Sequence, residues 1–298
     1  MGLPVLILMT AKPPNGYSKL LSLCLKKVKR HFCFQQMNEM EMFSMSKKIV
    51  SLVATTALTL SLLFLNSPAP ALADGETVTC IADLQKYIAA DMTDRDDSFS
   101  LHYTGDTTPV LADLKNIFLQ SAGSDDYLSL SWKEMGYTYS YHSGQLDINF
   151  TLNYHTTKEE EEYVDSTVKK LVAKLITPKM NDLSKETAIH QWIVQNVKYD
   201  YSLKQITAYT ALTDHRTTCM GYAMLMKKML QQAGLESKII TGYYPEGYHA
   251  WNMVKIDSKW YYLDTTSDWA IGETSPQNKT EAQMTAANYT WDRAQSAK

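Results

Sequence analysis

Two apolar segments near the C-terminal end are separated by only two residues, and this spacing constrains the fold more than any other feature. Residues 248–256 (YHAWNMVKI) and residues 259–266 (KWYYLDTT) both have the composition of strands, and Asp257-Ser258 joins them. A two-residue connection makes a tight antiparallel hairpin. Such a turn fixes the register, because the residues on either side of it must pair with each other.

That register predicts which polar side chains share a face of the sheet. His249 is expected opposite Thr266, and Asp264 opposite Trp251. Paired residues, and residues two apart on one strand, point to the same face, so His249 and Asp264 should be diagonal neighbours. An aspartate in this place can orient an imidazole and stabilise its protonated form. A connection one residue longer or shorter would place the two side chains on opposite faces.

A cysteine stands directly before the strongest helical pattern. Residues 220–233 have apolar side chains at helical spacing, and Gly234 suits the C-terminal end of that helix. Cys219 therefore lies at a helix N-terminus, where the unpaired amides and the positive helix end stabilise a thiolate. Its N–H could also bind an oxyanion. A cysteine, a strand histidine and an aspartate in this order form the arrangement that activates a thiol.

Cysteine usage leaves a second interpretation of Cys219 open. Of the four cysteines, Cys24 and Cys33 precede residues 45–73, which resemble an export signal. Only Cys80 and Cys219 would therefore remain in the exported protein. Two cysteines in an oxidising compartment can form a disulfide. The sequence has no CxxC motif and no cysteine–histidine cluster with zinc spacing, so we expect neither a metal nor another cofactor.

Residues 45–73 have the organisation of a secretory signal peptide. Two lysines follow Met45, residues 49–65 are apolar, and Ala71-Leu72-Ala73 is a small-residue cleavage site. A membrane anchor is the alternative, since the apolar run approaches spanning length. We expect cleavage, a mature chain from Asp74 and a secreted, extracellular or cell-wall-associated protein. Translation from Met45 is the simplest account of the preceding 44 residues, and a cytoplasmic extension is the alternative.

Charge restricts the partners of the predicted mature chain. Residues 74–298 contain 21 basic and 30 acidic side chains, a net charge of −9. Such a chain repels phosphate backbones, so nucleic acid is not an expected partner. We expect a protein or peptide substrate, and no stable membrane anchor after the signal is removed.

The mature chain is expected to have two parts. Residues 74–178 predict a mixed α/β module, with a strand at 127–132 and a long helix capped by Thr157. The run of glutamates at 159–162 favours the positive end of this helix over a calcium site. Residues 179–298 form the second part. Its first helix is expected to begin at Ser184 and to leave His190 solvated or packed at an edge.

Three short motifs in this second part resemble those of the transglutaminase-like superfamily, which has a papain-like cysteine fold. They are Cys219-Met-Gly-Tyr-Ala, His249-Ala-Trp-Asn and Lys259-Trp-Tyr-Tyr-Leu-Asp264-Thr-Thr. The segments IHQWIVQNVKYD and TAYTAL also look like those of bacterial secreted members, and the resemblance covers residues 182–268. Two departures are Thr217-Thr218, where members often have Gly-Val, and Ser267, where they often have tryptophan.

The resemblance implies an α+β fold, in which a helix carrying the cysteine packs on an antiparallel sheet carrying the histidine and aspartate. It also implies that Cys219, His249 and Asp264 are nucleophile, base and orienting acid. The expected function is an exported acyl-transfer enzyme that acts on a glutamine carboxamide or a peptide bond through a thioester. A papain-like cell-wall endopeptidase and a non-catalytic binding module that retains the fold are the alternatives.

Overall fold

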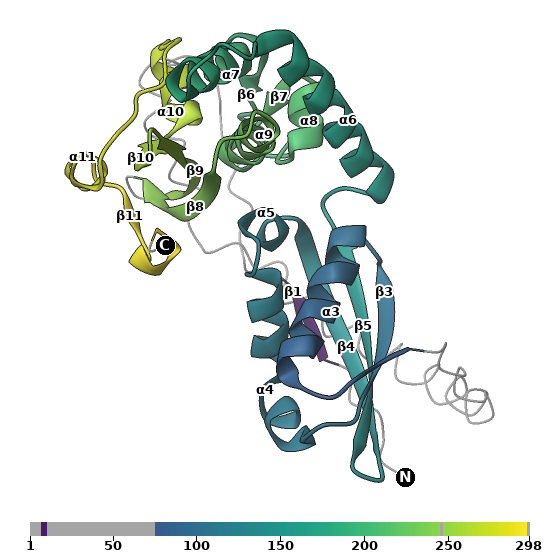
Figure 1. Cartoon of the computed structure of the whole chain (residues 1–298). Helices are drawn as coiled ribbons and strands as arrows, with labels where there is room; N and C mark the ends of the chain where they lie inside the picture. Colours follow the sequence, from purple (N-terminus) through teal and green to yellow (C-terminus); the bar gives the residue numbers. More distant parts are fainter. Residues whose placement is uncertain (1–6, 11–74, 245–246, 297–298) are drawn as a thin grey trace, which may run out of the picture. The chain divides into compact units, whose positions relative to one another are not determined.

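A computed structural model describes residues 7–10, 75–244 and 247–296. All of these residues belong to one compact unit. The predicted signal peptide, Cys24 and Cys33 lie outside the described residues. The described part combines helices with largely antiparallel sheets, which confirms the predicted α+β class (Figure 1).

A five-stranded sheet and two long helices build the first part. Its strand order is β1-β4-β5-β3-β2, with β2 parallel to β3 and the other neighbours antiparallel. Buried side chains of α3 and α4 pack on one face of this sheet and form a hydrophobic core with it. The elements are β1 (Ile7–Thr10), β2 (Glu76–Val78), α3 (Ile81–Asp94), β3 (Ser98–Tyr103), α4 (Thr107–Ala122), α5 (Asp126–Ser129), β4 (Trp132–His142) and β5 (Gln145–Tyr154).

The strand predicted at residues 127–132 is wrong, because the short helix α5 occupies its first half. The Asp125 carboxylate accepts hydrogen bonds from the backbone N–H groups of Tyr127 and Leu128, at 2.7 and 2.9 Å. This local cap favours a helical turn over the extended form that the alternating apolar residues suggest. The strand begins only at Trp132.

Helices surround a second, four-stranded antiparallel sheet with the order β10-β9-β8-β11. Helix α9 packs on β9 and β8, and most of its residues are buried. The elements are α6 (Lys158–Leu175), α7 (Asp182–Asn196), β6 (Lys198–Tyr199), α8 (Ala208–Thr213), β7 (Arg216–Thr217), α9 (Cys219–Gln232), β8 (Ser237–Tyr244), β9 (Gly247–Ile256), β10 (Lys259–Leu263), α10 (Thr265–Ile271), α11 (Glu281–Ala286), β11 (Thr290–Trp291) and a 3-10 turn (Arg293–Gln295).

Helix α6 begins as the sequence predicts. Thr157 accepts a hydrogen bond from the Glu160 N–H, and the Glu160 side chain accepts one from the Thr157 N–H, which is a complete capping box. Tyr163 of α6 is exposed, and its ring packs edge-on against Tyr209. The buried valines of α6 belong to the same core as α9. The domain boundary near residue 178 stays a prediction.

Helix α7 begins earlier than predicted. Asn181, and not Ser184, is its N-cap, and the Asn181 carboxamide oxygen accepts a hydrogen bond from the Ser184 N–H at 2.9 Å. The early start adds nearly one helical turn.

Helix α9 approaches the preceding segment closely at Gly221. A Cβ atom added there would lie 1.8 Å from Thr217 Oγ1 and 2.6 Å from the Thr207 carbonyl oxygen. A glycine at this position therefore lets the N-terminal end of α9 sit tightly against the chain that leads into α8.

We predict that Gly221→Ala destabilises the protein by about 1 to 3 kcal/mol, the usual cost of overpacking a buried site. Urea unfolding measures the change. Gly123→Ala is the matched control, because Gly123 ends α4 at an ordinary φ of −77° and an added Cβ would meet no atom closer than 3.1 Å. Equal stabilities of the two variants would contradict the prediction.

Candidate active site

The hairpin that carries His249 has the predicted register. Ile256 pairs with Lys259 at the turn, and the pairing continues along β9 and β10 without a shift. Asp257 and Ser258 have φ values of 47° and 65°, as a two-residue turn of the primed type requires.

The end of the hairpin differs from the prediction. Strand β10 stops at Leu263, and Thr266 lies in helix α10, so the expected pairing of His249 with Thr266 is wrong. The reason is local, since the Asp264 carboxylate caps α10 by accepting a hydrogen bond from the Ser267 N–H at 3.1 Å. Asp264 therefore stands at the junction of β10 and α10.

His249 and Asp264 meet despite this difference. The Nε2–H of His249 donates to Asp264 Oδ2 at 2.8 Å, and the two residues are 3% and 1% exposed. Burial opposes ionisation of both groups, but their mutual attraction outweighs it. The pKa of His249 is raised, mainly by the Asp264 carboxylate, and the pKa of Asp264 is lowered by the charge and hydrogen bond of His249. Each group therefore favours the charged form of the other.

Cys219 is the third predicted residue, and it is the first residue of α9. It is 7% exposed, and a hydrogen bond and an electrostatic interaction with Cys219 are among the causes of the raised pKa of His249. His249 Nδ1, the ring nitrogen not used by Asp264, is buried and has no oxygen or nitrogen partner among the described residues. The ring can thus face a carboxylate through one nitrogen and the thiol through the other.

The disulfide interpretation of Cys219 is contradicted. Cys219 and Cys80 are both free, and Cys80 is exposed at the start of α3. The Cys80 thiol donates instead to the Asp83 carboxylate at 3.2 Å.

Backbone and side-chain hydrogen bonds hold the Cys219 end of α9 in place. The Thr218 N–H donates to the Gln205 carbonyl at 2.8 Å, just before the helix begins. About one turn into the helix, the buried Asn252 carboxamide of β9 donates to the Ala223 carbonyl at 2.9 Å. Asn252 therefore joins the helix that carries the thiol to the strand that carries His249.

Two partners of Asp264 are absent from the sequence prediction. The hydroxyl groups of Ser267 and Tyr289 donate to Asp264 Oδ2 at 2.7 and 2.6 Å. Ser267 was visible only as a departure from the family motif. Tyr289 follows 25 residues after Asp264 in no recognisable motif, so the sequence contains no signal that could have identified it.

A second buried polar cluster lies between α7 and α10. His190 Nε2 is 3.0 Å from Asp268 Oδ2, and the Asn278 amide donates to Glu186 at 2.8 Å. His190 is fully buried, which contradicts the predicted solvated or edge-packed position, because α10 brings Asp268 against α7. Within residues 75–244 and 247–296, no three His, Cys, Asp or Glu side chains form a group that could hold a metal ion.

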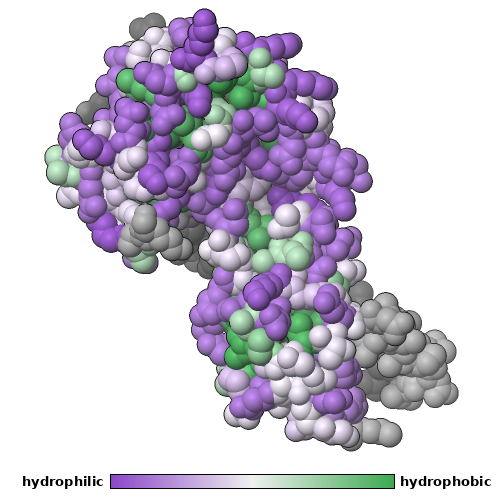
Figure 2. Space-filling view, in the orientation of Figure 1, coloured by the Kyte–Doolittle hydropathy of each residue, from purple (hydrophilic) through white to green (hydrophobic). Residues whose placement is uncertain are grey.

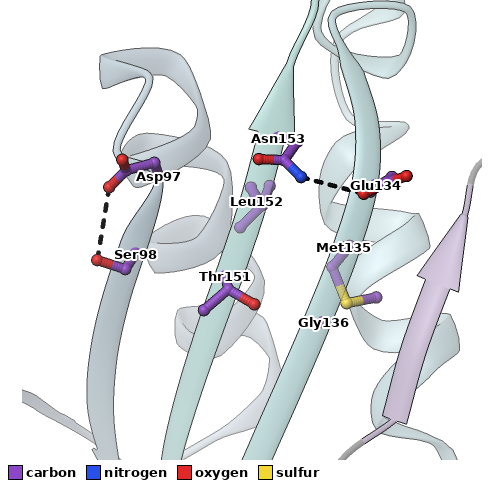
Figure 3. Close-up of a pocket in the computed structure, with 8 residues that line it drawn as sticks. All are labelled: Asp97, Ser98, Glu134, Met135, Gly136, Thr151, Leu152 and Asn153. Carbon is purple, nitrogen blue, oxygen red and sulfur yellow. Dashed lines mark hydrogen bonds between the residues drawn. The ribbon is translucent and has the colours of Figure 1, made fainter.

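A shallow pocket elsewhere lacks the groups for nucleophilic chemistry. It lies on β3, β4 and β5 of the first part, and no cysteine or histidine lines it (Figure 3). Its polar side chains bond in pairs, Ser98 to Asp97 at 3.5 Å and Asn153 to Glu134 at 3.0 Å.

The surface offers no single large apolar face in the view of Figure 2, where hydrophobic side chains form small separate groups in a mostly polar surface. None of the described helices combines the length and the apolar character needed to cross a membrane.

Residues 169–265 match the family model of the transglutaminase-like superfamily. The chain is 31% identical over 127 residues to kyphoscoliosis peptidase of Mus musculus and 31% identical over 120 residues to that of Homo sapiens. These alignments cover 37% and 34% of this chain, which spans only about a fifth of the relatives, 19% and 18% of their length. A crystal structure of a TGase is similar over 56% of this chain and 50% of that chain, with 16% identity and a TM-score of 0.34.

The second buried cluster generates a prediction about stability. Burial raises the pKa of Glu186 to about 7, although the Asn278 hydrogen bond and His190 oppose the rise. Because the folded protein holds this proton more tightly than the unfolded chain, the stabilisation is complete below the unfolded pKa of about 4.3 and is lost as the pH rises through 7.

We predict that Glu186→Gln, which is neutral at every pH, removes this loss. The variant should gain on the order of 2 to 3 kcal/mol relative to the wild type between pH 5 and pH 8, measured by urea unfolding. The exposed Glu162→Gln is the control and should follow the wild type. A Glu186→Gln curve parallel to that of the wild type would refute the assignment of the buried proton.

Proposed function

We propose that this chain, whose residues 169–265 belong to the transglutaminase-like superfamily, is an exported acyl-transfer enzyme that works through a cysteine thioester. Cys219 is the nucleophile, His249 the base and Asp264 the orienting acid. The observation that carries the proposal is the buried hydrogen bond between His249 and Asp264, next to a thiol at a helix start. A thiol beside a base that a third group orients is the arrangement that activates a cysteine nucleophile.

The first half of the proposed reaction forms the thioester. The Cys219 thiolate attacks the carbonyl carbon of a carboxamide or peptide bond, and the carbonyl oxygen becomes an oxyanion. The positive end of α9 and the Cys219 N–H stabilise that oxyanion. When the intermediate collapses, the carbon–nitrogen bond breaks, and the leaving amine takes the proton that the His249 imidazolium holds.

The second half releases the acyl group. Neutral His249 takes a proton from the incoming nucleophile, which attacks the thioester carbonyl, and Cys219 leaves as the thiolate. An amine acceptor gives a crosslink, whereas water gives deamidation or hydrolysis. Asp264 stays ionised throughout and stabilises each imidazolium as it forms.

Peptide-bond hydrolysis is the second candidate reaction, and the similarity to kyphoscoliosis peptidase favours it. The alignments cover only about a fifth of those relatives, 19% and 18% of their length, so the likeness does not determine the acyl group or the acceptor. Product analysis separates the candidates, because transamidation and deamidation release ammonia from glutamine peptides and an endopeptidase creates new peptide N-termini.

The proposal also includes the export of the enzyme and the class of its substrate. The signal-like residues 45–73 and the net charge of −9 for residues 74–298 support a secreted or cell-wall-associated enzyme with a protein or peptide substrate, and not a nucleic-acid partner. Intact mass of the protein recovered from the medium would test this point, since cleavage after Ala73 leaves a chain that begins at Asp74.

We predict that a small alkylating reagent labels Cys219 rapidly well below pH 8, because the His249 imidazolium stabilises the thiolate. His249→Ala should slow that labelling at pH 6 to 7 by at least about tenfold. Mass spectrometry of the peptides reads each cysteine separately, and the exposed Cys80 is the internal control. Labelling of Cys219 that is indifferent to His249→Ala would favour the non-catalytic binding module.

We predict that Cys219→Ala abolishes turnover, because in the proposed reaction the thioester forms on the Cys219 sulfur. Asp264→Asn should lower the rate by on the order of 10² to 10⁴, because the amide can neither orient the imidazole correctly nor stabilise its charge. Both variants are assayed for ammonia release and for peptide cleavage, with circular dichroism to verify folding. Turnover by Cys219→Ala would overturn the proposed function.

A further inference from the structure

We propose that Tyr289 is a positioning residue of the active site, which holds the Asp264 carboxylate in the orientation that serves His249. This inference rests on the proposed function, because it assigns Tyr289 a part in preparing the same three residues. Tyr289 lies outside residues 169–265, the part of the chain that matches the family model.

The hydrogen bonds on Asp264 define what Tyr289 does. One carboxylate oxygen, Oδ2, accepts from His249 Nε2 at 2.8 Å, from the Tyr289 hydroxyl at 2.6 Å and from the Ser267 hydroxyl at 2.7 Å. An aspartate carboxylate turns easily about its last torsion angle. Donors from three directions remove that freedom, so the lone pair that meets the imidazole keeps one direction.

The Tyr289 ring is itself fixed. It is 2% exposed, stacks on Tyr244 with ring centroids 4.0 Å apart, and meets the Trp251 ring edge-on at 5.2 Å. Burial, followed by the Asp264 charge, raises the pKa of the Tyr289 phenol. The phenol therefore keeps its proton and remains a donor to the carboxylate.

The chain after α11 delivers Tyr289 to the site. Strand β11 is an edge strand of the sheet and pairs with β8, where Trp291 lies opposite Gly242. A Cβ atom at Gly242 would lie only 2.1 Å from the Thr290 carbonyl oxygen, so the glycine permits this close approach. Farther along, the Gln295 carboxamide accepts from the Thr241 N–H at 2.9 Å and donates to the Thr241 carbonyl at 3.0 Å.

These contacts make the C-terminal segment a strap across one edge of the sheet. The strap comprises residues 289–295. At its first residue, Tyr289 bonds to Asp264, and at its last, the Gln295 side chain bonds to the backbone of β8. Without the strap, Asp264 would keep only the partners supplied by β9 and α10.

The test uses Tyr289→Phe, which keeps the ring and removes only the hydroxyl. The protonation of His249 is followed by ¹⁵N nuclear magnetic resonance of the histidine side chains as a function of pH, with His249→Gln to assign the signal. If Tyr289 positions the carboxylate, the imidazolium of the variant loses part of its stabilisation. The His249 titration should then move to lower pH by about one unit, a tenfold loss of proton affinity.

Tyr127→Phe is the matched control, because Tyr127 is also buried and its hydroxyl donates to a carboxylate, that of Glu161, at 2.9 Å. It should lower stability similarly and leave the His249 titration unchanged. Gln295→Leu provides a second variant that loosens the strap without touching Tyr289, and it should move the titration in the same direction by a smaller amount.

Two results would overturn the inference. An unchanged His249 titration in folded Tyr289→Phe would leave Tyr289 a purely structural role. A move to higher pH would mean that the hydroxyl only withdraws charge from the carboxylate. Neither result depends on turnover, so the test of Tyr289 is separate from the test of the proposed function. Activity that survives Cys219→Ala would reject the proposed function, and the His249 titration would still decide whether Tyr289 acts on His249.

Discussion

The buried carboxylate of Asp264 can stay ionised only because donors surround it, and the candidate site depends on this constraint. Its four hydrogen bonds come from a strand, a helix start and a distant tyrosine. The ionised carboxylate in turn raises the pKa of His249 against the effect of burial, which favours a positive charge on the ring. A buried imidazolium next to a cysteine stabilises the thiolate that the proposed chemistry needs.

Positioning of the thiol depends on a second set of interactions. Helix α9 is buried on most sides, so its axis is set by packing, and the Asn252 hydrogen bond to the Ala223 carbonyl fixes the helix against β9. Gly221 permits the close contact with the segment before α8. Cys219 and His249 lie on elements that cannot slide past each other without breaking buried hydrogen bonds and leaving polar atoms unpaired.

Local signals explain which features could be predicted from the sequence. The two-residue turn at Asp257-Ser258 fixes the hairpin register, and Cys219 stands before an unmistakable helix. The failures arise where a short polar contact or a distant segment decides the outcome. Asp125 caps a helix in a predicted strand, Asp264 ends β10 early, and α10 encloses His190. Tyr289 could not be predicted, because only the completed sheet brings β11 and its neighbours to Asp264.

The central claim is that Cys219 and His249 form a thiolate–imidazolium pair. The most direct measurement is the ultraviolet absorbance of the thiolate, taken as the difference between the protein and Cys219→Ser over a range of pH. The account predicts that the thiolate signal of Cys219 persists at pH 6 and disappears at that pH in a His249→Gln background. A signal that appears only near pH 8.5, as for an ordinary cysteine, and that ignores His249→Gln would contradict the account.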